Sequence, residues 1–276
     1  MRTALLQLNV SDEPTANLAV TLRFVREAAT RGARFVLTPE VSNCISTSRS
    51  HQNAVLQPEE DDMTLAALRA EAKSHGIWLL IGSLALKTQD ADGRFANRSF
   101  MIDPQGEIVA RYDKIHMFDV DVTPEETWRE SEGYRPGAQA VIAQTEFAPV
   151  GLSICYDIRF PKLYAALANA GAQILTVPAA FSPVTGATHW HTLLRARAIE
   201  TGCFVLAPAQ TGEHASKRHK TRRTYGHSLV VTPWGEVQMD ADEAPGVYMT
   251  DIDMGEVAKA RGRVPSLANA RPFDGP

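Results

Sequence analysis

Short apolar runs alternate with longer segments of helical periodicity along almost the whole chain. Seven runs are predicted to be strands because they are short, aliphatic and bounded by Pro, Gly or polar residues: TALLQLNV, FVLTPEV, WLLIGSLAL, VGLSICYD, QILTVPAAF, CFVLAPAQ and HSLVVTPWGEV. Three segments between them carry apolar residues three or four apart and close on glycine, as helices do: LAVTLRFVREAATRG, MTLAALRAEAKSHG and HWHTLLRARAIETG. This alternation predicts an α/β protein in which helices pack on sheets.

The same order of elements occurs twice. In each half a strand, a helix, a strand, a helix and a strand are followed by a segment that predicts a β-hairpin. The two hairpin segments, RSFMIDPQGEIV and HSLVVTPWGEV, share an apolar run, a proline and a Gly-Glu pair. Two similar sheets packed face to face, with helices outside, would form four α-β-β-α layers. No linker separates the halves, so we expect one domain over residues 1–276.

Composition and charge narrow the class of protein. Of the 276 residues, 44% are hydrophobic and 22% are charged, which suits a soluble protein with a full core. The net charge of −4 gives no reason to expect nucleic acid or an anionic membrane as a partner. Three widely spaced cysteines argue against a disulfide framework, and the first residues lack the apolar run of a signal peptide. We therefore expect a cytoplasmic protein.

Three residues with chemical potential follow predicted strands. Glu40 ends FVLTPE, Lys114 follows the hairpin strand GEIVARYD, and Cys155 ends VGLSIC. Taken singly, a solvated acid, a surface lysine and a buried inert cysteine are the commoner interpretations. Taken together they predict a site, because ligands of open α/β sheets bind beyond the carboxyl ends of the strands.

These three residue types can perform nucleophilic catalysis together. An unperturbed thiol has a pKa of about 8.5, so Cys155 needs a base at neutral pH, and no histidine is close to it in the sequence. Glu40 could accept the proton, and Lys114 could stabilise first the thiolate and then the oxyanion of an attacked carbonyl. The backbone N–H of Tyr156, near the start of the predicted helix RFPKLYAALANAG, could donate a second hydrogen bond to that oxyanion.

Four segments resemble signature segments of the nitrilase superfamily, the carbon–nitrogen hydrolases: LTPEVSN, YDKIHMFDVDV, WRESEGYRPG and GLSICYDIRFP. The resemblance extends over essentially the whole chain and includes the order and spacing of the segments. It implies an α-β-β-α sandwich with Glu40 as general base, Lys114 as oxyanion stabiliser and Cys155 as nucleophile. It also implies a fourth acid at Glu130, with Glu132 as the alternative for that position.

Later segments, TVPAAFSPVTGATHW and TYGHSLVVTPWGEV, are similar to the branch that hydrolyses ω-amides of 2-oxo acids. That branch comprises the ω-amidases, which act on 2-oxoglutaramate, and the deaminated glutathione amidases. The segments RARAIET and AQTGEH resemble the deaminated glutathione amidases more than the ω-amidases. The resemblance implies hydrolysis of a linear amide to an acid and ammonia through a Cys155 thioester. By analogy, Arg159 and Thr185 would hold the substrate carboxylate. The alternatives are an ion pair of Arg159 with Asp157 and a turn hydroxyl at Thr185.

Other functions stay open on the sequence alone. They are ω-amidase activity on 2-oxoglutaramate, nitrile or N-carbamoyl hydrolysis, and a scaffold without activity. The basic stretch HASKRHKTRR, residues 214–223, is either a solvated loop or a lid that attracts an anionic substrate.

We also expect a small-molecule amide as the partner, and neither a metal nor a nucleotide cofactor. The histidines lack the spacing of a metal motif, and no GxGxxG or P-loop sequence occurs. Members of the family pair through helices beside the active site, so the resemblance implies a homodimer or a higher homo-oligomer.

Overall fold

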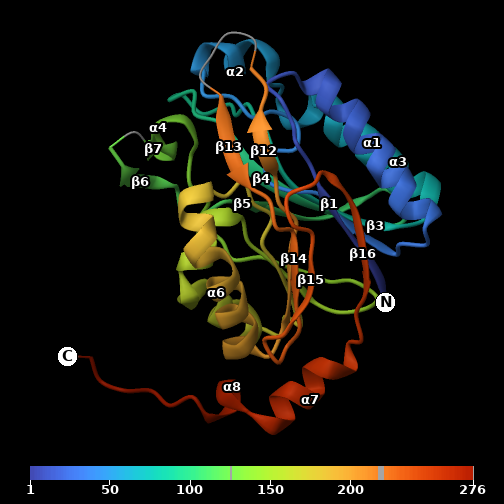
Figure 1. Cartoon of the computed structure of the whole chain (residues 1–276), viewed down its shortest axis with the longest axis vertical. Coiled ribbons are helices and arrows are strands. Elements are labelled where there is room, and N and C mark those ends of the chain that lie inside the picture. The colour runs from blue at the N-terminus through green and yellow to red at the C-terminus, as the bar shows by residue number, and fades with distance from the viewer. Residues whose placement is uncertain (125, 217–220, 276) are drawn as a thin grey trace.

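Two six-stranded sheets form the centre of the protein (Figure 1), in a computed structural model that describes residues 1–124, 126–216 and 221–275. The first sheet has the order β16-β1-β2-β3-β4-β5 and the second β15-β14-β11-β10-β9-β8. Strands of the first sheet are β1 (Arg2–Gln7), β2 (Phe35–Leu37), β3 (Trp78–Leu86), β4 (Ala96–Ile102), β5 (Ile108–Asp113) and β16 (Gly246–Asp251). Strands of the second are β8 (Ile142–Ala143), β9 (Val150–Leu152), β10 (Ile174–Thr176), β11 (Phe204–Ala207), β14 (Leu229–Val231) and β15 (Val237–Asp240).

The two sheets repeat one topology. In the first, β1, β2 and β3 pair in parallel, and β4 and β5 continue the sheet antiparallel. In the second, β9, β10 and β11 pair in parallel, and β14 and β15 continue it antiparallel. The duplication and both predicted hairpins are therefore confirmed, because each strand has a counterpart at the same place in the other sheet.

Helices cover the outer faces of both sheets (Figure 1). Helices α1 (Pro14–Thr30) and α3 (Met63–His75) pack on the first sheet, and α5 (Pro161–Asn169) and α6 (Pro183–Thr201) pack on the second. Local signals set several ends: the Asp62 side chain accepts from the Leu65 N–H at 2.8 Å to cap α3, which stops at left-handed Gly76. The remaining helices are α2 (Arg49–Val55), η1 (Glu59–Asp61), α4 (Glu130–Gly133), η2 (Cys155–Arg159), α7 (Gly255–Arg263) and α8 (Ser266–Asn269).

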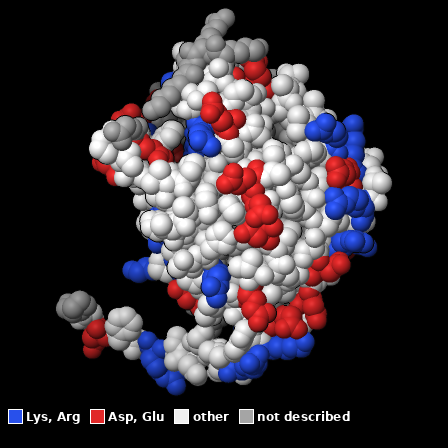
Figure 2. Space-filling model, viewed as in Figure 1, with Lys and Arg blue, Asp and Glu red and all other residues white. Residues whose placement is uncertain are grey.

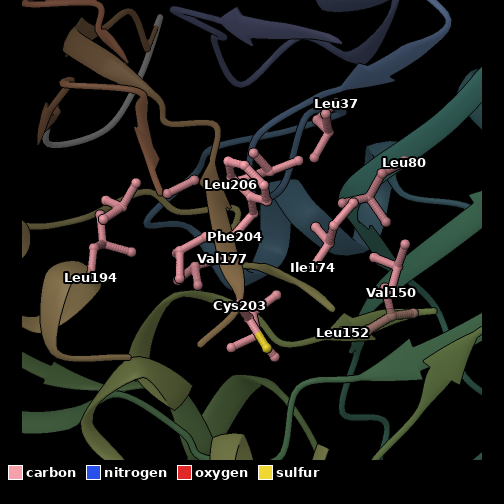
Figure 3. Close-up of a cluster of buried hydrophobic side chains, with 14 of the residues drawn as sticks. Leu37, Leu80, Val150, Leu152, Ile174, Val177, Leu194, Cys203, Phe204 and Leu206 are labelled. Atoms are coloured by element: carbon pink, nitrogen blue, oxygen red, sulfur yellow. The ribbon is translucent and has the colours of Figure 1, made fainter. Parts of the chain in front are cut away.

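The buried apolar residues form two clusters, and the first also includes residues of α5 and α6 such as Leu167 and Leu194. Leu5, Leu37 and Leu80 of the first sheet belong to one buried cluster with Val150 and Ile174 of the second, so the sheets pack face to face (Figure 3). The neighbouring residues in the first sheet, such as Leu6, Val36 and Leu79, point to the opposite face, where they join residues of α1 and α3. Side chains alternate across a strand, so one strand contributes to both clusters. The predicted four-layer sandwich is confirmed.

Two small ribbons were not predicted, and both reach the candidate site. They are β6 (Asp119–Thr123) with β7 (Glu126–Arg129), and β12 (Thr211–His214) with β13 (Arg222–Tyr225). On the face shown in Figure 2, acidic and basic side chains are interspersed. None of the helices formed by the described residues has the length and apolar character needed to cross a membrane.

Candidate active site

Three strand ends bring Glu40, Lys114 and Cys155 to one buried point. Glu40 follows β2, Lys114 follows β5 directly, and Cys155 follows β9 as the first residue of η2. The Lys114 Nζ lies 2.9 Å from Oε1 of Glu40, and the Cys155 thiol interacts with both groups. The exposed fractions of the three residues are 4%, 2% and 7%, so water screens these contacts little. Glu40, Lys114 and Cys155 therefore lie together, as the sequence predicted.

The backbone around Cys155 is unusual. Cys155 has a left-handed φ of 49°, which a residue with a Cβ rarely adopts, and its N–H donates to the Pro178 carbonyl at 2.9 Å. Pro178 also packs against Gly82 of β3, where an added Cβ would overlap the Thr38 carbonyl oxygen and the Pro178 side chain. The two sheets therefore approach closely here, and the turn that presents the thiol is held by its neighbours.

Hydrogen bonds fix the Glu40 carboxylate on both oxygens. Oε1 accepts from the Asn97 side chain at 2.9 Å and from Lys114, while Oε2 accepts from the Ala180 N–H at 2.8 Å. The carbonyl of Glu40 accepts from Gln210 at 2.9 Å. All of these partners are donors, which favours the ionised carboxylate.

Glu130 is the second carboxylate on Lys114. Both of its oxygens lie 2.9 Å from the Lys114 Nζ, and one also accepts from the Phe118 N–H at 2.6 Å. Glu132 lines the same cavity and has no ion pair with Lys114. Of the two acids that the sequence left open, the structure therefore places Glu130 against the lysine.

The charges at this point set the protonation states. Burial alone would lower the pKa of Lys114, but Glu130 and Glu40 hold it well above its usual value. Burial would raise the pKa of Glu40, but Lys114, Arg222 and Asn97 together lower it. Burial and then the Glu40 charge raise the pKa of the Cys155 thiol against the opposing effect of Lys114. The resting site thus holds a neutral thiol beside an ionised carboxylate that can accept its proton.

A cavity of about 930 Å³ opens onto these residues. Tyr156 and Thr185 line it, as predicted, and the Tyr156 N–H has no protein acceptor among the described residues. The hydroxyls of Thr185 and Ser182, at the start of α6, are buried there without a hydrogen-bond partner. Buried hydroxyls are normally satisfied, so these two point to a ligand.

Arg159, the other expected substrate anchor, does not belong to the described lining of this cavity, and its buried Nε has no hydrogen-bond partner among the described residues. Its guanidinium lies over the rings of Tyr156 and Phe181, at 5.8 and 5.5 Å, and donates to His189 at 3.2 Å. The expected alternative partner, Asp157, is instead buried and accepts from other groups. Packing of the short helix η2 turns Arg159 toward α6.

Arg222 is a cavity residue that the sequence analysis did not single out. It lies on β13, within the basic stretch 214–223, of which residues 217–220 lie outside the described residues. Its NH2 donates to the Ala180 carbonyl at 2.6 Å, and its guanidinium stacks over Trp128 at 4.8 Å. The cavity lining also includes Arg49, Arg129 and Arg223. Arg49 donates to the carbonyls of Gly133 and Gly93, and Arg129 pairs with Asp121. The only signal in the sequence was the local excess of basic residues.

Replacing Glu40 by Gln should lower the pKa of Cys155. The carboxylate beside the thiol disfavours the thiolate, and Lys114 remains when that charge is removed, so a shift of about 1–3 pH units is expected. Thiolate absorbance, titrated against pH and corrected with Cys155→Ser protein, measures it. Glu132→Gln, in the same cavity, is the control and should leave the midpoint unchanged. A midpoint in Glu40→Gln at or above that of the wild type would contradict this electrostatic picture.

Comparisons with known proteins agree with the fold. The carbon–nitrogen hydrolase family model matches residues 2–262. The chain is 37% identical over 269 residues to the deaminated glutathione amidase of Yersinia enterocolitica, covering 97% of this chain and 92% of that protein.

Two solved structures are also similar. The C. elegans NitFhit protein has a TM-score of 0.89 and 34% identity over 98% of this chain and 65% of its own. An amidase from Nesterenkonia sp. AN1, with an acrylamide adduct on its active-site cysteine, has a TM-score of 0.77 and 26% identity over 96% and 98% of the two chains. The extent of the family match and the identity to the Yersinia protein show that the chain belongs to the carbon–nitrogen hydrolase family.

Proposed function

We propose that the protein is an amidase that hydrolyses the ω-amide of a 2-oxo acid, of the deaminated glutathione type, through a thioester on Cys155. The observation that carries this proposal is the buried contact of Lys114 with two carboxylates beside the thiol, at the floor of a cavity with room for a small molecule. The relatedness to a deaminated glutathione amidase supports the substrate class.

The first half of the reaction forms the thioester. Sγ of Cys155 attacks the amide carbon while Glu40 takes the thiol proton. The carbonyl oxygen becomes an oxyanion, which the Lys114 ammonium and the Tyr156 N–H stabilise. When the tetrahedral intermediate collapses, Glu40 returns the proton to the nitrogen, the C–N bond breaks, and the amine leaves.

The second half hydrolyses the thioester. Glu40, again ionised, takes a proton from water as the water oxygen attacks the thioester carbon. The oxyanion is stabilised as before, the C–S bond breaks, and Glu40 returns its proton to the sulfur. Glu130 acts as a positioning residue in both halves, because its two hydrogen bonds to Lys114 fix the ammonium and favour its charged form.

The cavity wall supports a substrate with a carboxylate. Arg222 acts on the Glu40 carboxylate through its charge, and its Ala180 contact holds it beside the catalytic groups. The unpartnered hydroxyls of Ser182 and Thr185 lie at the first turn of α6, where the helix dipole favours an anion. We therefore assign the carboxylate to Arg222, Ser182 and Thr185, which line the cavity.

The leaving amine depends on the substrate. A simple ω-amide releases ammonia, whereas deaminated glutathione releases the dipeptide that glutathione carries on its γ-amide. A cavity of about 930 Å³ has room for the larger substrate, since drug-sized ligands occupy pockets of about 300–1,000 Å³.

We propose a cytoplasmic homodimer that pairs through α6. Val184 and Ile199 of α6 are 52% and 53% exposed, and Trp234 of the neighbouring β14–β15 hairpin is 41% exposed. The segment after α8 extends away from the body (Figure 1), with Phe273 90% exposed, which suits contact with a second copy. Three unpaired cysteines support a reducing compartment.

Cys155→Ala should abolish hydrolysis of both 2-oxoglutaramate and deaminated glutathione, by at least about 10⁴-fold, because no other nucleophile is in place. Chromatography of the released acid measures turnover for both leaving groups. A nitrile and an N-carbamoyl amino acid complete the panel. Cys44→Ala, another cavity cysteine, is the control and should stay active. Faster turnover of the nitrile or the N-carbamoyl compound, or activity in Cys155→Ala, would contradict the proposal.

Arg222→Gln should raise the KM for the 2-oxo-acid amide about 10- to 100-fold, because charge-assisted hydrogen bonds to the carboxylate are lost. A neutral amide of the same length makes no such bonds, so its KM should change little. Arg34→Gln is the control, because Arg34 is an exposed arginine outside the cavity lining. An equal rise in KM for the anionic and the neutral amide would contradict carboxylate binding by Arg222 and would assign this residue to the catalytic groups alone.

A further inference from the structure

A second cluster of potential ligands lies where α6 meets the segment around the β14–β15 hairpin. Nε2 of His191, on α6, is 2.8 Å from Oδ2 of Asp240, the last residue of β15. Nδ1 of His227, just before β14, is 2.9 Å from Oδ1 and 3.2 Å from Oδ2 of the same carboxylate. The three ligand atoms all lie within 4.8 Å of one another.

We propose that His191, His227 and Asp240 form a binding site for one divalent transition-metal ion of the zinc class. Two imidazole nitrogens and one carboxylate oxygen suit Zn²⁺, and also Co²⁺, Ni²⁺ and Cu²⁺. The ion would displace the protons now shared between the imidazoles and the carboxylate. The imidazole nitrogens and the carboxylate oxygens would then move apart by a few tenths of an ångström, because tetrahedral bonds to the ion are about 2.0–2.1 Å long.

The backbone at this cluster carries the same kind of strain as the active site. Among the described residues, four that are not glycine have a left-handed φ: Val41, Cys155, His227 and Asp242. Val41 and Cys155 line the catalytic cavity, whereas His227 belongs to this cluster and Asp242 donates a hydrogen bond to one of its ligands, Asp240. Such conformations concentrate at functional sites, where the surrounding structure holds them in place.

The left-handed residues His227 and Asp242 also make hydrogen bonds that orient the ligand atoms. The His227 N–H donates to the Asp242 carbonyl at 2.7 Å, and the Asp242 N–H donates to Oδ1 of Asp240 at 2.9 Å. The His227 carbonyl accepts from the Trp190 indole at 2.8 Å, which ties the loop to α6. These bonds aim the His227 imidazole at Asp240 and orient the carboxylate before any ion arrives.

The ligands are reachable from solvent. The side chains of His191, His227 and Asp240 are 34%, 18% and 28% exposed, which leaves an open side for a water molecule as fourth ligand. A bound ion would connect α6 to the second sheet and would brace the helix whose first turn lines the catalytic cavity. We expected no metal from the sequence, since these ligands come from separate segments and form no motif.

Zinc and cobalt titrations test the site. The protein is used without a histidine tag and as Cys155→Ala, so that neither a tag nor the catalytic thiol can supply the ligands. Calorimetry should show one saturable Zn²⁺ site, and Co²⁺ should give visible bands without the sulfur charge transfer of a thiolate ligand. His191→Ala and Asp240→Ala should each weaken binding at least tenfold, because even outer-shell changes cost about 10- to 100-fold.

Two further variants separate this site from others. His189→Ala, on the same helix, is the matched control and should bind like the parent. His51→Ala removes a member of the other grouping of possible ligands, Asp12, Glu13 and His51. Absence of saturable binding, binding unchanged by His191→Ala, or binding lost in His51→Ala instead would each overturn the proposal, and the cluster would then be a hydrogen-bonded clamp only.

Discussion

The site depends on one buried ammonium between two carboxylates. Lys114 is 2% exposed and contacts Glu40 and Glu130 at 2.9 Å, so the buried ammonium depends on the two carboxyl groups around it. Burial, and then the Glu40 charge, raise the pKa of the Cys155 thiol against the opposing effect of Lys114, which keeps the proton on sulfur at rest. Glu40 and Cys155 therefore lie side by side as base and nucleophile. The proton passes from the Cys155 thiol to Glu40 when the sulfur attacks the carbonyl carbon of the substrate.

The duplicated fold explains how residues so far apart in sequence meet. Each sheet presents the carboxyl ends of its parallel strands at the same edge, and face-to-face packing brings the two edges together. Glu40 and Lys114 come from the first sheet and Cys155 from the second. The close approach at Gly82 and the left-handed turn at Cys155 occur at this junction. The packing of the two sheets therefore also forms the catalytic contact.

Strand–helix periodicity predicted the duplication and the strand ends that carry Glu40, Lys114 and Cys155, and the resemblance to the nitrilase superfamily implied the four layers. Periodicity was insufficient wherever a side chain's direction depends on packing of distant segments. Arg159 turns toward α6 and His189, while Arg222 enters the cavity from a ribbon with no clear strand signal. Asn97, Ala180 and Gln210, which hold Glu40, carry no chemical signature in the sequence at all. Likewise, His191, His227 and Asp240 become neighbours only in the fold.

Partitioning by hydroxylamine tests the central claim most directly. 2-Oxoglutaramate and deaminated glutathione share one acyl group and differ in the amine that leaves, so a thioester on Cys155 would be the same species from both. With hydroxylamine competing against water, the account predicts hydroxamate and acid in one ratio from either substrate, and neither product in Cys155→Ala. A ratio that differs between the two substrates, or acid formed without hydroxamate, would contradict covalent catalysis by the triad.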